Sequence, residues 1–213
     1  MRDGLGPEIL PASDAGSLAA AAAAMRSGGI VGMPTETVYG IGVVPRPGPL
    51  RAVIAAKQRV DDKGIALLVD GLDQVAGLVI VSAAARQLAE RFWPGPLTLV
   101  LPVRRDEVVP EALTGGRGTL GVRIPDHAVP RGLARQLGPI AVTSANRSGE
   151  PEARTARELV DAFGASLALV LDDGPVRGGV ASTVVAVGAD GAIRMLREGA
   201  LGEARIESVL GGD

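Results

Sequence analysis

Short apolar runs alternate with amphipathic or alanine-rich segments along the whole chain. Helical spacing and strong helix formers predict helices over residues 17–27, 49–57, 82–92, 131–138 and 155–163. Apolar runs that end in turn residues predict strands over residues 30–33, 65–71, 97–103, 119–125, 139–145, 167–174, 182–188 and 192–199. Because helices and strands interleave throughout, we predict an α/β fold in a single domain, residues 1–213, with a twisted and largely buried sheet.

Polar clusters occur where three of these predicted strands begin or end. MPTETVYG follows the strand at 30–33, and Pro34 should stop that strand before Thr35. TSANRSG follows the strand at 139–145, and STV opens the strand at 182–188. Small hydroxyls, an amide and free backbone N–H groups at strand ends can bind a phosphate or a carboxylate. Taken singly, each cluster is equally consistent with an ordinary hydrogen-bonded turn.

Cationic side chains stand in unusual positions. Arg123 lies inside the strand-like run GVRIP, so it needs an anionic partner if it is buried. Arg197 follows two apolar residues and raises the same question. Lys57 extends an apolar helical stripe and is followed closely by Arg59. The pair suits an anion site, although a lysine stem covering the core is an equally good interpretation of Lys57.

Other features favour structural roles. Gly116, Gly118 and Gly121 match the spacing of a dinucleotide-binding loop, but here a loop precedes a strand instead of a strand preceding a helix. We therefore interpret residues 105–118 as a flexible excursion. His127 stands at an expected helix entry, and the tryptophan of FWPGP is expected to end a helix and pack against the core.

Composition narrows the class of protein. The 213 residues are 46% hydrophobic and 22% charged, with a net charge of -2, no cysteine and one histidine. Thiolate chemistry, disulfides and multi-histidine metal sites are excluded. No apolar run reaches the roughly 18 residues needed to cross a bilayer, and the N-terminus does not resemble a signal peptide. We expect a cytoplasmic protein without a membrane partner.

Seven motifs together resemble the YrdC/Sua5 family, from about residue 15 to 200. They are PTETVYG, Lys57-x-Arg59, FWPGPLTLVL, GVRIPDH, TSANRSG, STVV and LREGA. The resemblance implies a YrdC-like domain in which a twisted mixed sheet with flanking helices surrounds a large, positively lined cavity. It further implies threonylcarbamoyl-AMP synthesis, in which L-threonine, bicarbonate and ATP yield threonylcarbamoyl-AMP and pyrophosphate for tRNA modification.

The resemblance also implies residue roles. The positions similar to the family's threonine-binding set are Thr35, Arg123, Thr143 and Ser182. The positions similar to its ATP-binding set are Lys57, Arg59, Ser144, Asn146 and Arg197, of which Lys57 and Arg59 are expected to be catalytic. Mg²⁺ is expected with ATP, held by the nucleotide and water without a protein metal site. Possible partners are tRNA and the proteins of the threonylcarbamoyl-transferase complex.

The sequence departs from the family pattern after Arg59. It has KQRVDDKGIALLV where the family usually has a proline after the arginine and a later Pro-Leu pair. The chain also resembles the short YrdC type, without the additional C-terminal domain of the Sua5 branch. A YrdC-like paralogue that binds nucleotide or RNA without synthase activity is therefore the alternative. A carbamoyl-transfer module of the hydrogenase-maturation type is less favoured, because such modules lie within much larger chains.

Overall fold

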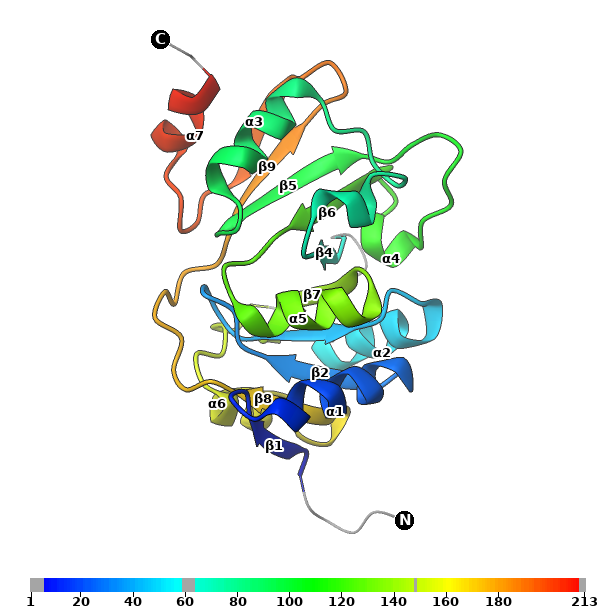
Figure 1. Ribbon diagram of the computed structural model, residues 1–213, viewed down its shortest axis with the longest axis vertical. Coiled ribbons are helices and arrows are strands. Elements are labelled where there is room, and N and C mark those ends of the chain that lie inside the picture. The colour runs from blue at the N-terminus through cyan, green and yellow to red at the C-terminus, as the bar shows by residue number, and fades with distance from the viewer. Residues whose placement is uncertain (1–5, 59–63, 148, 211–213) are drawn as a thin grey trace.

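A single ten-stranded mixed sheet organises the protein (Figure 1). The computed structural model describes residues 6–58, 64–147 and 149–210. The strands are β1 (Glu8–Pro11), β2 (Ile30–Met33), β3 (Gly40–Val43), β4 (Ala66–Leu68), β5 (Leu97–Pro102), β6 (Thr119–Arg123), β7 (Ile140–Ser144), β8 (Leu167–Asp172), β9 (Thr183–Val187) and β10 (Ile193–Arg197). They are ordered β1-β8-β2-β3-β7-β4-β6-β5-β9-β10. This confirms the predicted α/β class and mixed sheet.

Helices flank the sheet on both faces. They are α1 (Ala15–Arg26), α2 (Pro47–Lys57), α3 (Ala83–Phe92), α4 (Glu111–Thr114), α5 (Ala128–Leu137), α6 (Ala156–Phe163) and α7 (Glu203–Leu210), with 3₁₀ turns η1 (Leu72–Val75) and η2 (Gly164–Ser166). Helices α1 and α5 contact each other over β2, β8, β4 and β7, whereas α3 packs with α7 beside β5. No helix in the described part of the chain is long and apolar enough to cross a membrane.

Most predicted elements are present, and their ends follow the expected local chemistry. β2 ends at Met33, directly before Pro34. Ser82 accepts a hydrogen bond from the backbone N–H of Ala85 and caps α3. Thr155 caps α6 by accepting from the N–H of Glu158, but the Glu158 carboxylate accepts from Arg154 and not from Thr155. In a regular capping box the Glu158 carboxylate would accept from the N–H of the N-cap residue, Thr155; here it accepts from the N–H of the preceding residue, Arg154.

Four elements were not predicted: β1, β3, α4 and α7. The sequence of β3, GIGV, contains two glycines, which weaken any strand signal. Close packing against β7 explains the choice at Gly40, because a Cβ there would lie 2.8 Å from Val142 Cγ1 and 3.2 Å from the backbone oxygen of Thr143. Helix α4 lies inside the segment interpreted as a flexible excursion, so that interpretation was wrong for residues 111–114.

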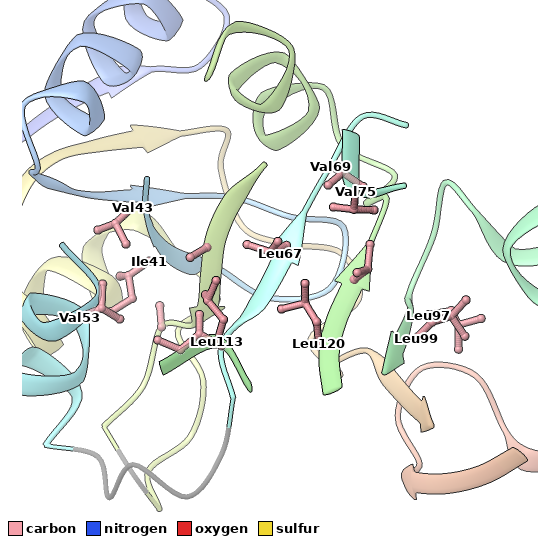
Figure 2. Packing of buried hydrophobic residues seen from close by; sticks show 14 of the residues in the cluster. Ile41, Val43, Val53, Leu67, Val69, Val75, Leu97, Leu99, Leu113 and Leu120 are labelled. Carbon is pink, nitrogen blue, oxygen red and sulfur yellow. The ribbon is translucent and has the colours of Figure 1, made fainter. Parts of the chain in front are cut away.

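Alternating strand residues supply two cores on opposite faces of the sheet. Met25 of α1 and Leu133 of α5 belong to the smaller core. The larger core contains Leu50 and Val53 of α2, along with residues from strands, α3, α6 and α7. Figure 2 shows part of it, including Val53 close to Ile41. The larger core extends under β5, β6 and β9 and covers one face of these strands. Their other face lines a cavity.

His127 is the N-cap of α5, as its position at a helix entry suggested. Its Nδ1 accepts a hydrogen bond from the backbone N–H of Val129, at 3.2 Å. The proton of the neutral ring is therefore on Nε2, which lies 3.2 Å from Asp173 Oδ2. Burial lowers the pKa of His127, and the negative charges of Asp173, Glu36 and Asp126 oppose that shift incompletely.

This lowered pKa predicts a stability change with pH. Below the unfolded-state pKa of 6.5 the unfolded chain binds a proton more readily than the native one. The contribution of His127 is therefore present above that value and is lost as pH falls through the native pKa. We expect His127→Asn, which keeps an N-cap acceptor, to lose less free energy of unfolding from about pH 7.5 to about pH 5 than the wild type. Denaturant titrations at each pH measure this, and parallel profiles would contradict it.

Candidate functional site

A cavity of about 880 Å³ lies against the curved half of the sheet formed by β4, β6, β5, β9 and β10. The two-residue period of the strands separates its lining from the core. In β5, Leu97, Leu99 and Leu101 face the larger core, while Thr98 and Val100 line the cavity. The same alternation holds in β6 and β9. The cavity and the core thus share the same strands.

The strand register places Arg123, Thr98, Val184 and Arg197 in one row across the cavity floor. Thr98 pairs with Val184, and Val184 pairs with Arg197, while Arg123 follows the Leu99–Val122 pair by one position. Arg197 joins this row because the β9–β10 register shifts between Met195 and Arg197. That β-bulge re-aims the side chain, which in a regular strand would face away from the cavity.

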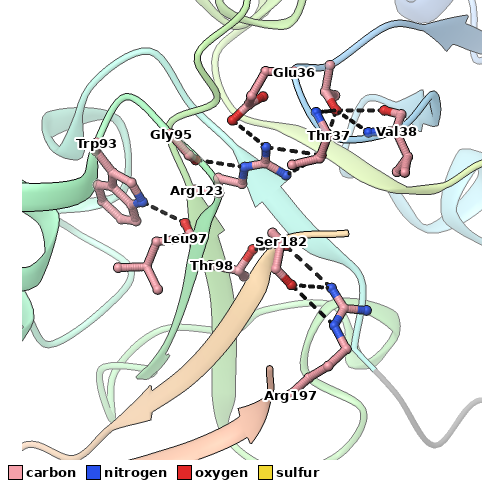
Figure 3. A network of polar contacts seen from close by, with 11 residues as sticks. Glu36, Thr37, Val38, Trp93, Gly95, Leu97, Thr98, Arg123, Ser182 and Arg197 are labelled. Atoms are coloured by element: carbon pink, nitrogen blue, oxygen red, sulfur yellow. Dashed lines mark hydrogen bonds and ion pairs between the residues drawn. The ribbon is translucent and has the colours of Figure 1, made fainter. Parts of the chain in front are cut away.

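Arg123 is buried and held on several sides (Figure 3). Its Nη2 lies 2.6 Å from Glu36 Oε1, so the anionic partner expected from the sequence is present. Nε donates to the carbonyl oxygen of Gly95 at 3.0 Å, and both terminal nitrogens donate to Thr37 Oγ1 at 3.2–3.3 Å. The guanidinium plane is therefore fixed before any ligand binds.

Thr35 builds the turn that carries Thr37 and Glu36. Its hydroxyl donates to the carbonyl of Val38 at 2.6 Å and accepts from the N–H groups of Thr37 and Val38. Its oxygen is also 2.8 Å from Thr37 Oγ1. Thr35 lines the cavity as predicted, but its proton is already donated within the turn. A direct hydrogen bond from this hydroxyl to a ligand would have to replace that internal bond.

Ser182 and Arg197 form a second polar cluster on the cavity wall (Figure 3). Arg197 donates from Nε and Nη2 to the Ser182 carbonyl, at 3.2 and 2.7 Å. Ser182 Oγ lies 2.9 Å from Thr98 Oγ1. Gly199 makes this packing possible, because a Cβ there would lie 2.7 Å from the Ser182 backbone. Arg197 binds the Ser182 carbonyl, and, unlike Arg123, it has no ion pair among the described residues.

Lys57 reaches the polar end of β7. The side chain is 4% exposed, and its Nζ donates to the Ser144 carbonyl at 2.6 Å and to Asn146 Oδ1 at 3.0 Å. The Ser144 hydroxyl donates to the same amide oxygen at 2.7 Å. The structure therefore brings three of the proposed ATP-binding residues together, and the lysine stem is also buried. Arg59 and the divergent loop after it lie outside the described residues.

Most of the remaining candidates line the cavity directly. Thr143 and Ser144 do so from β7 and Ser182 from the start of β9, whereas Lys57 and Asn146 lie behind Ser144. Tyr39 also lines the cavity, but its hydroxyl donates to Asp172 Oδ1 or the Gly174 carbonyl. Burial raises the pKa of Tyr39, so the phenol stays neutral.

The aromatic motif FWPGP serves the structure. Helix α3 ends at Phe92, and Trp93 is its C-cap residue. The indole Nε1 of Trp93 donates to the Leu97 carbonyl at 2.6 Å, and the ring packs against the larger core. The motif then supplies the Gly95 carbonyl that accepts from Arg123. The expected structural role of the tryptophan is confirmed.

Sequence reasoning included Thr37 in the polar PTETVYG turn but missed other cavity residues, among them Thr98, Arg117 and Arg194. For Thr98 a signal was present, because it interrupts the apolar run LTLVLP at a position opposite in phase to the leucines. Arg194 is one residue from Ile193, which packs on the core, so the strand period places it on the cavity side. Arg117 is in a loop and carries no periodic signal.

The cavity is electrostatically suited to anions. Its lining includes Arg117, Arg123, Arg194 and Arg197, with no acidic residue in the described lining. Burial lowers the pKa of Arg197, and the nearby positive charge of Arg123 adds to this shift against the opposing field of Glu152. The described residues contain no cluster of three or more histidine, cysteine or acidic side chains. The donor set therefore fits an anion or metal–nucleotide complex better than a bare cation.

Known proteins resemble this chain over most of its length. The Sua5_yciO_yrdC family model, described as telomere recombination, matches residues 23–199. A threonylcarbamoyl-AMP synthase from Bacillus subtilis is 36% identical over 91% of this chain and 56% of its own. A putative threonylcarbamoyl-AMP synthase from Mycobacterium leprae is 37% identical over 94% of this chain and 91% of its own. The chain thus spans little more than half of the Bacillus protein, but nearly all of the mycobacterial one.

Solved structures agree with this relationship. Pyrococcus abyssi Sua5 in complex with L-threonine has a TM-score of 0.85 and 38% identity, over 91% of this chain and 57% of that one. Escherichia coli YciO shares the fold with a TM-score of 0.80 at 22% identity. With a family match that spans most of the sequence and relatives above 30% identity along it, the chain belongs to the Sua5/YciO/YrdC family.

Proposed function

We propose that the protein is a threonylcarbamoyl-AMP synthase, a nucleotidyltransferase that condenses L-threonine, bicarbonate and ATP. The observation that carries the proposal is the arginine- and hydroxyl-lined cavity, in a chain related to proteins of that name. A related Sua5 has been solved with L-threonine, which makes this amino acid the first ligand to test. A nucleotide- or RNA-binding paralogue without synthase activity is the alternative outcome of that test.

The row containing Arg123 is proposed to hold L-threonine. Thr35, Arg123, Thr143 and Ser182, from four separate segments, all line the same cavity, which supports their assignment to one ligand. Arg123 gives most of its N–H groups to protein acceptors, so its contribution is a fixed positive field with little remaining donor capacity. Its field and the Ser182 hydroxyl suit the amino acid carboxylate.

The ATP phosphates are proposed to lie near the end of β7. Ser144 and Arg197 line the cavity, Lys57 and Asn146 support Ser144 from behind, and Arg59 is assigned by family resemblance alone. No protein carboxylate lies in the described lining, so Mg²⁺ would be held by the triphosphate and water. Bound there, the ion would neutralise charge on the phosphates.

The reaction needs no protein nucleophile. The amine of L-threonine combines with bicarbonate and loses water, which gives a carbamate. A carbamate oxygen then bonds to the α-phosphorus of ATP as the bond to the bridging oxygen of pyrophosphate breaks. Orientation of both substrates and fixed positive charges supply the catalysis. This matches a cavity rich in arginine and hydroxyl groups in a chain without cysteine.

The proposed product would pass to a threonylcarbamoyl-transferase complex that modifies tRNA. Direct contact with tRNA and with that complex belongs to the proposal, as does a cytoplasmic location, where ATP and tRNA are found. The cavity alone accounts for the first half-reaction, and nothing in this proposal requires tRNA for it.

Pyrophosphate release tests the activity. With ATP, Mg²⁺, bicarbonate and L-threonine we expect steady release, which stops when threonine or bicarbonate is omitted. L-Valine, which replaces the threonine hydroxyl with a methyl group, is the matched control for side-chain recognition. Threonine-independent release, or no release although ATP binds, would favour the paralogue.

A further inference from the structure

Thr98 is a buried cavity residue that the assignments above leave without a role. It lies on β5 and is 6% exposed. Its neighbours in the strand, Leu97 and Leu99, face the core, so the Thr98 side chain faces the cavity. Among the described residues, its hydroxyl has one hydrogen-bond partner, Ser182 Oγ at 2.9 Å. The partner is itself only 7% exposed and lines the cavity.

Either hydroxyl can donate in this bond, because each has one proton and two lone pairs. Whichever one donates, the other keeps a proton that no described protein group accepts, and both residues line the cavity. Arg197 Nη2 is 3.4 Å from Ser182 Oγ and can only donate to it. In the arrangement in which Thr98 also donates, Ser182 accepts from both neighbours and keeps its own proton for an acceptor beside Arg197.

The surroundings indicate what that acceptor is. Ser182 lines the cavity beside the row that Arg123 and Arg197 close at either end. Burial is the main cause that lowers the pKa of Arg197, and repulsion from Arg123, which lines the same cavity, adds to it. Glu36 pairs with Arg123, whereas Arg197 has no ion pair among the described residues. An anionic ligand oxygen is the acceptor that accounts for the Arg197 charge and the neighbouring Ser182 hydroxyl.

We propose that Thr98 is a positioning residue, which donates to Ser182 and so directs the Ser182 proton to the carboxylate of the bound amino acid. This deepens the proposed function and rests on it, since it assumes that L-threonine is the ligand. Hydrogen bonds in such a chain strengthen each other, so the effect of Thr98 reaches the ligand without contact. The proposal concerns affinity and not the chemical step.

Calorimetric titration of the full-length protein with L-threonine tests this inference. Thr98→Val keeps the shape and removes the hydroxyl, and we expect binding to weaken about five- to tenfold. Thr98→Ala cannot overpack the site, is made in parallel and carries the same expectation. Thr98→Ser restores the hydroxyl and should recover most of the affinity. Thr114→Val is the matched control, because Thr114 lines the same cavity but its hydroxyl bonds only within its own turn.

A second ligand and a kinetic measurement separate this role from simple packing. L-Threoninol lacks the carboxylate, so its affinity should be nearly the same for wild type and Thr98→Val. The KM for threonine should rise in Thr98→Val while kcat at saturating threonine stays near wild type. A purely structural role would lower the melting temperature and leave the preference for L-threonine over L-threoninol unchanged.

Each outcome has a separate meaning. A wild-type protein that binds no L-threonine, alone or with ATP and Mg²⁺, overturns both this inference and the proposed function. Normal threonine binding by both Thr98→Val and Thr98→Ala overturns the inference alone. Failure of Thr98→Ser to recover affinity shows that the hydroxyl is not the cause. Equal losses for L-threonine and L-threoninol overturn the assignment of the carboxylate as acceptor.

Discussion

Replacing Arg123 with methionine is expected to lower both activity and stability more than any other single change considered. The substitution leaves the partly buried Glu36 carboxylate without its cation, at a cost of about 3 kcal/mol in the free energy of unfolding. It also removes the fixed positive charge from the row in which threonine is proposed to bind. We expect kcat/KM for threonine to fall by at least about 100-fold.

A second variant separates the two effects. Arg123→Met combined with Glu36→Gln removes both charges and should recover much of the lost stability, while activity stays low. Arg135→Met is the control, because Arg135 pairs with Asp70 at the surface, with its side chain 55% exposed. Arg135→Met should lower the free energy of unfolding by less than about 1 kcal/mol. Denaturant unfolding and pyrophosphate release measure both quantities, and an active double variant would contradict the role given to Arg123.

Lys57→Met is expected to have the next largest effect. Methionine retains a long apolar stem in the buried channel but removes the ammonium that bonds Ser144 and Asn146. We expect turnover to fall at least about 100-fold. Each acceptor loses a charged donor but keeps a neutral one, so a stability loss of about 1–3 kcal/mol accompanies it.

Arg51→Met provides the control on the same helix, where the arginine is exposed. It should leave both turnover and unfolding close to wild type. Pyrophosphate release at varied ATP concentration, with denaturant unfolding of each variant, gives the comparison. Near-normal turnover by Lys57→Met at saturating ATP would show that Lys57 has a structural role only.

The sequence was sufficient for most helices and for the central strands, because their periodicity and caps are local. Ser82 and Thr155 cap the helices that they were predicted to begin. It was insufficient for β3, because its close approach to β7, which favours glycine at position 40, is a long-range contact with no local signal. Local patterns also hid the order of the strands, which depends on long-range pairing.

The same limit applies to the site. A buried Arg123 could be expected to need an anion, but identifying Glu36 required the PTET turn and β6 to meet. Strand phase carried an unused signal for Thr98, and its link to Ser182 depends on β5 pairing with β9. Arg197 faces the cavity because of a β-bulge that the sequence AIRMLREG does not reveal. The sequence therefore indicated which kinds of residue form the site, but not which residues they contact.

The central claim is that this cavity makes one mixed anhydride from three substrates. The most direct measurement incubates the protein with ¹³C-bicarbonate, L-threonine, ATP and Mg²⁺ and identifies the nucleotide product by mass spectrometry. We predict threonylcarbamoyl-AMP that carries the ¹³C label, formed in step with pyrophosphate and greatly reduced in Arg123→Met with Glu36→Gln. Unlabelled AMP or ADP as the sole nucleotide product would contradict the account.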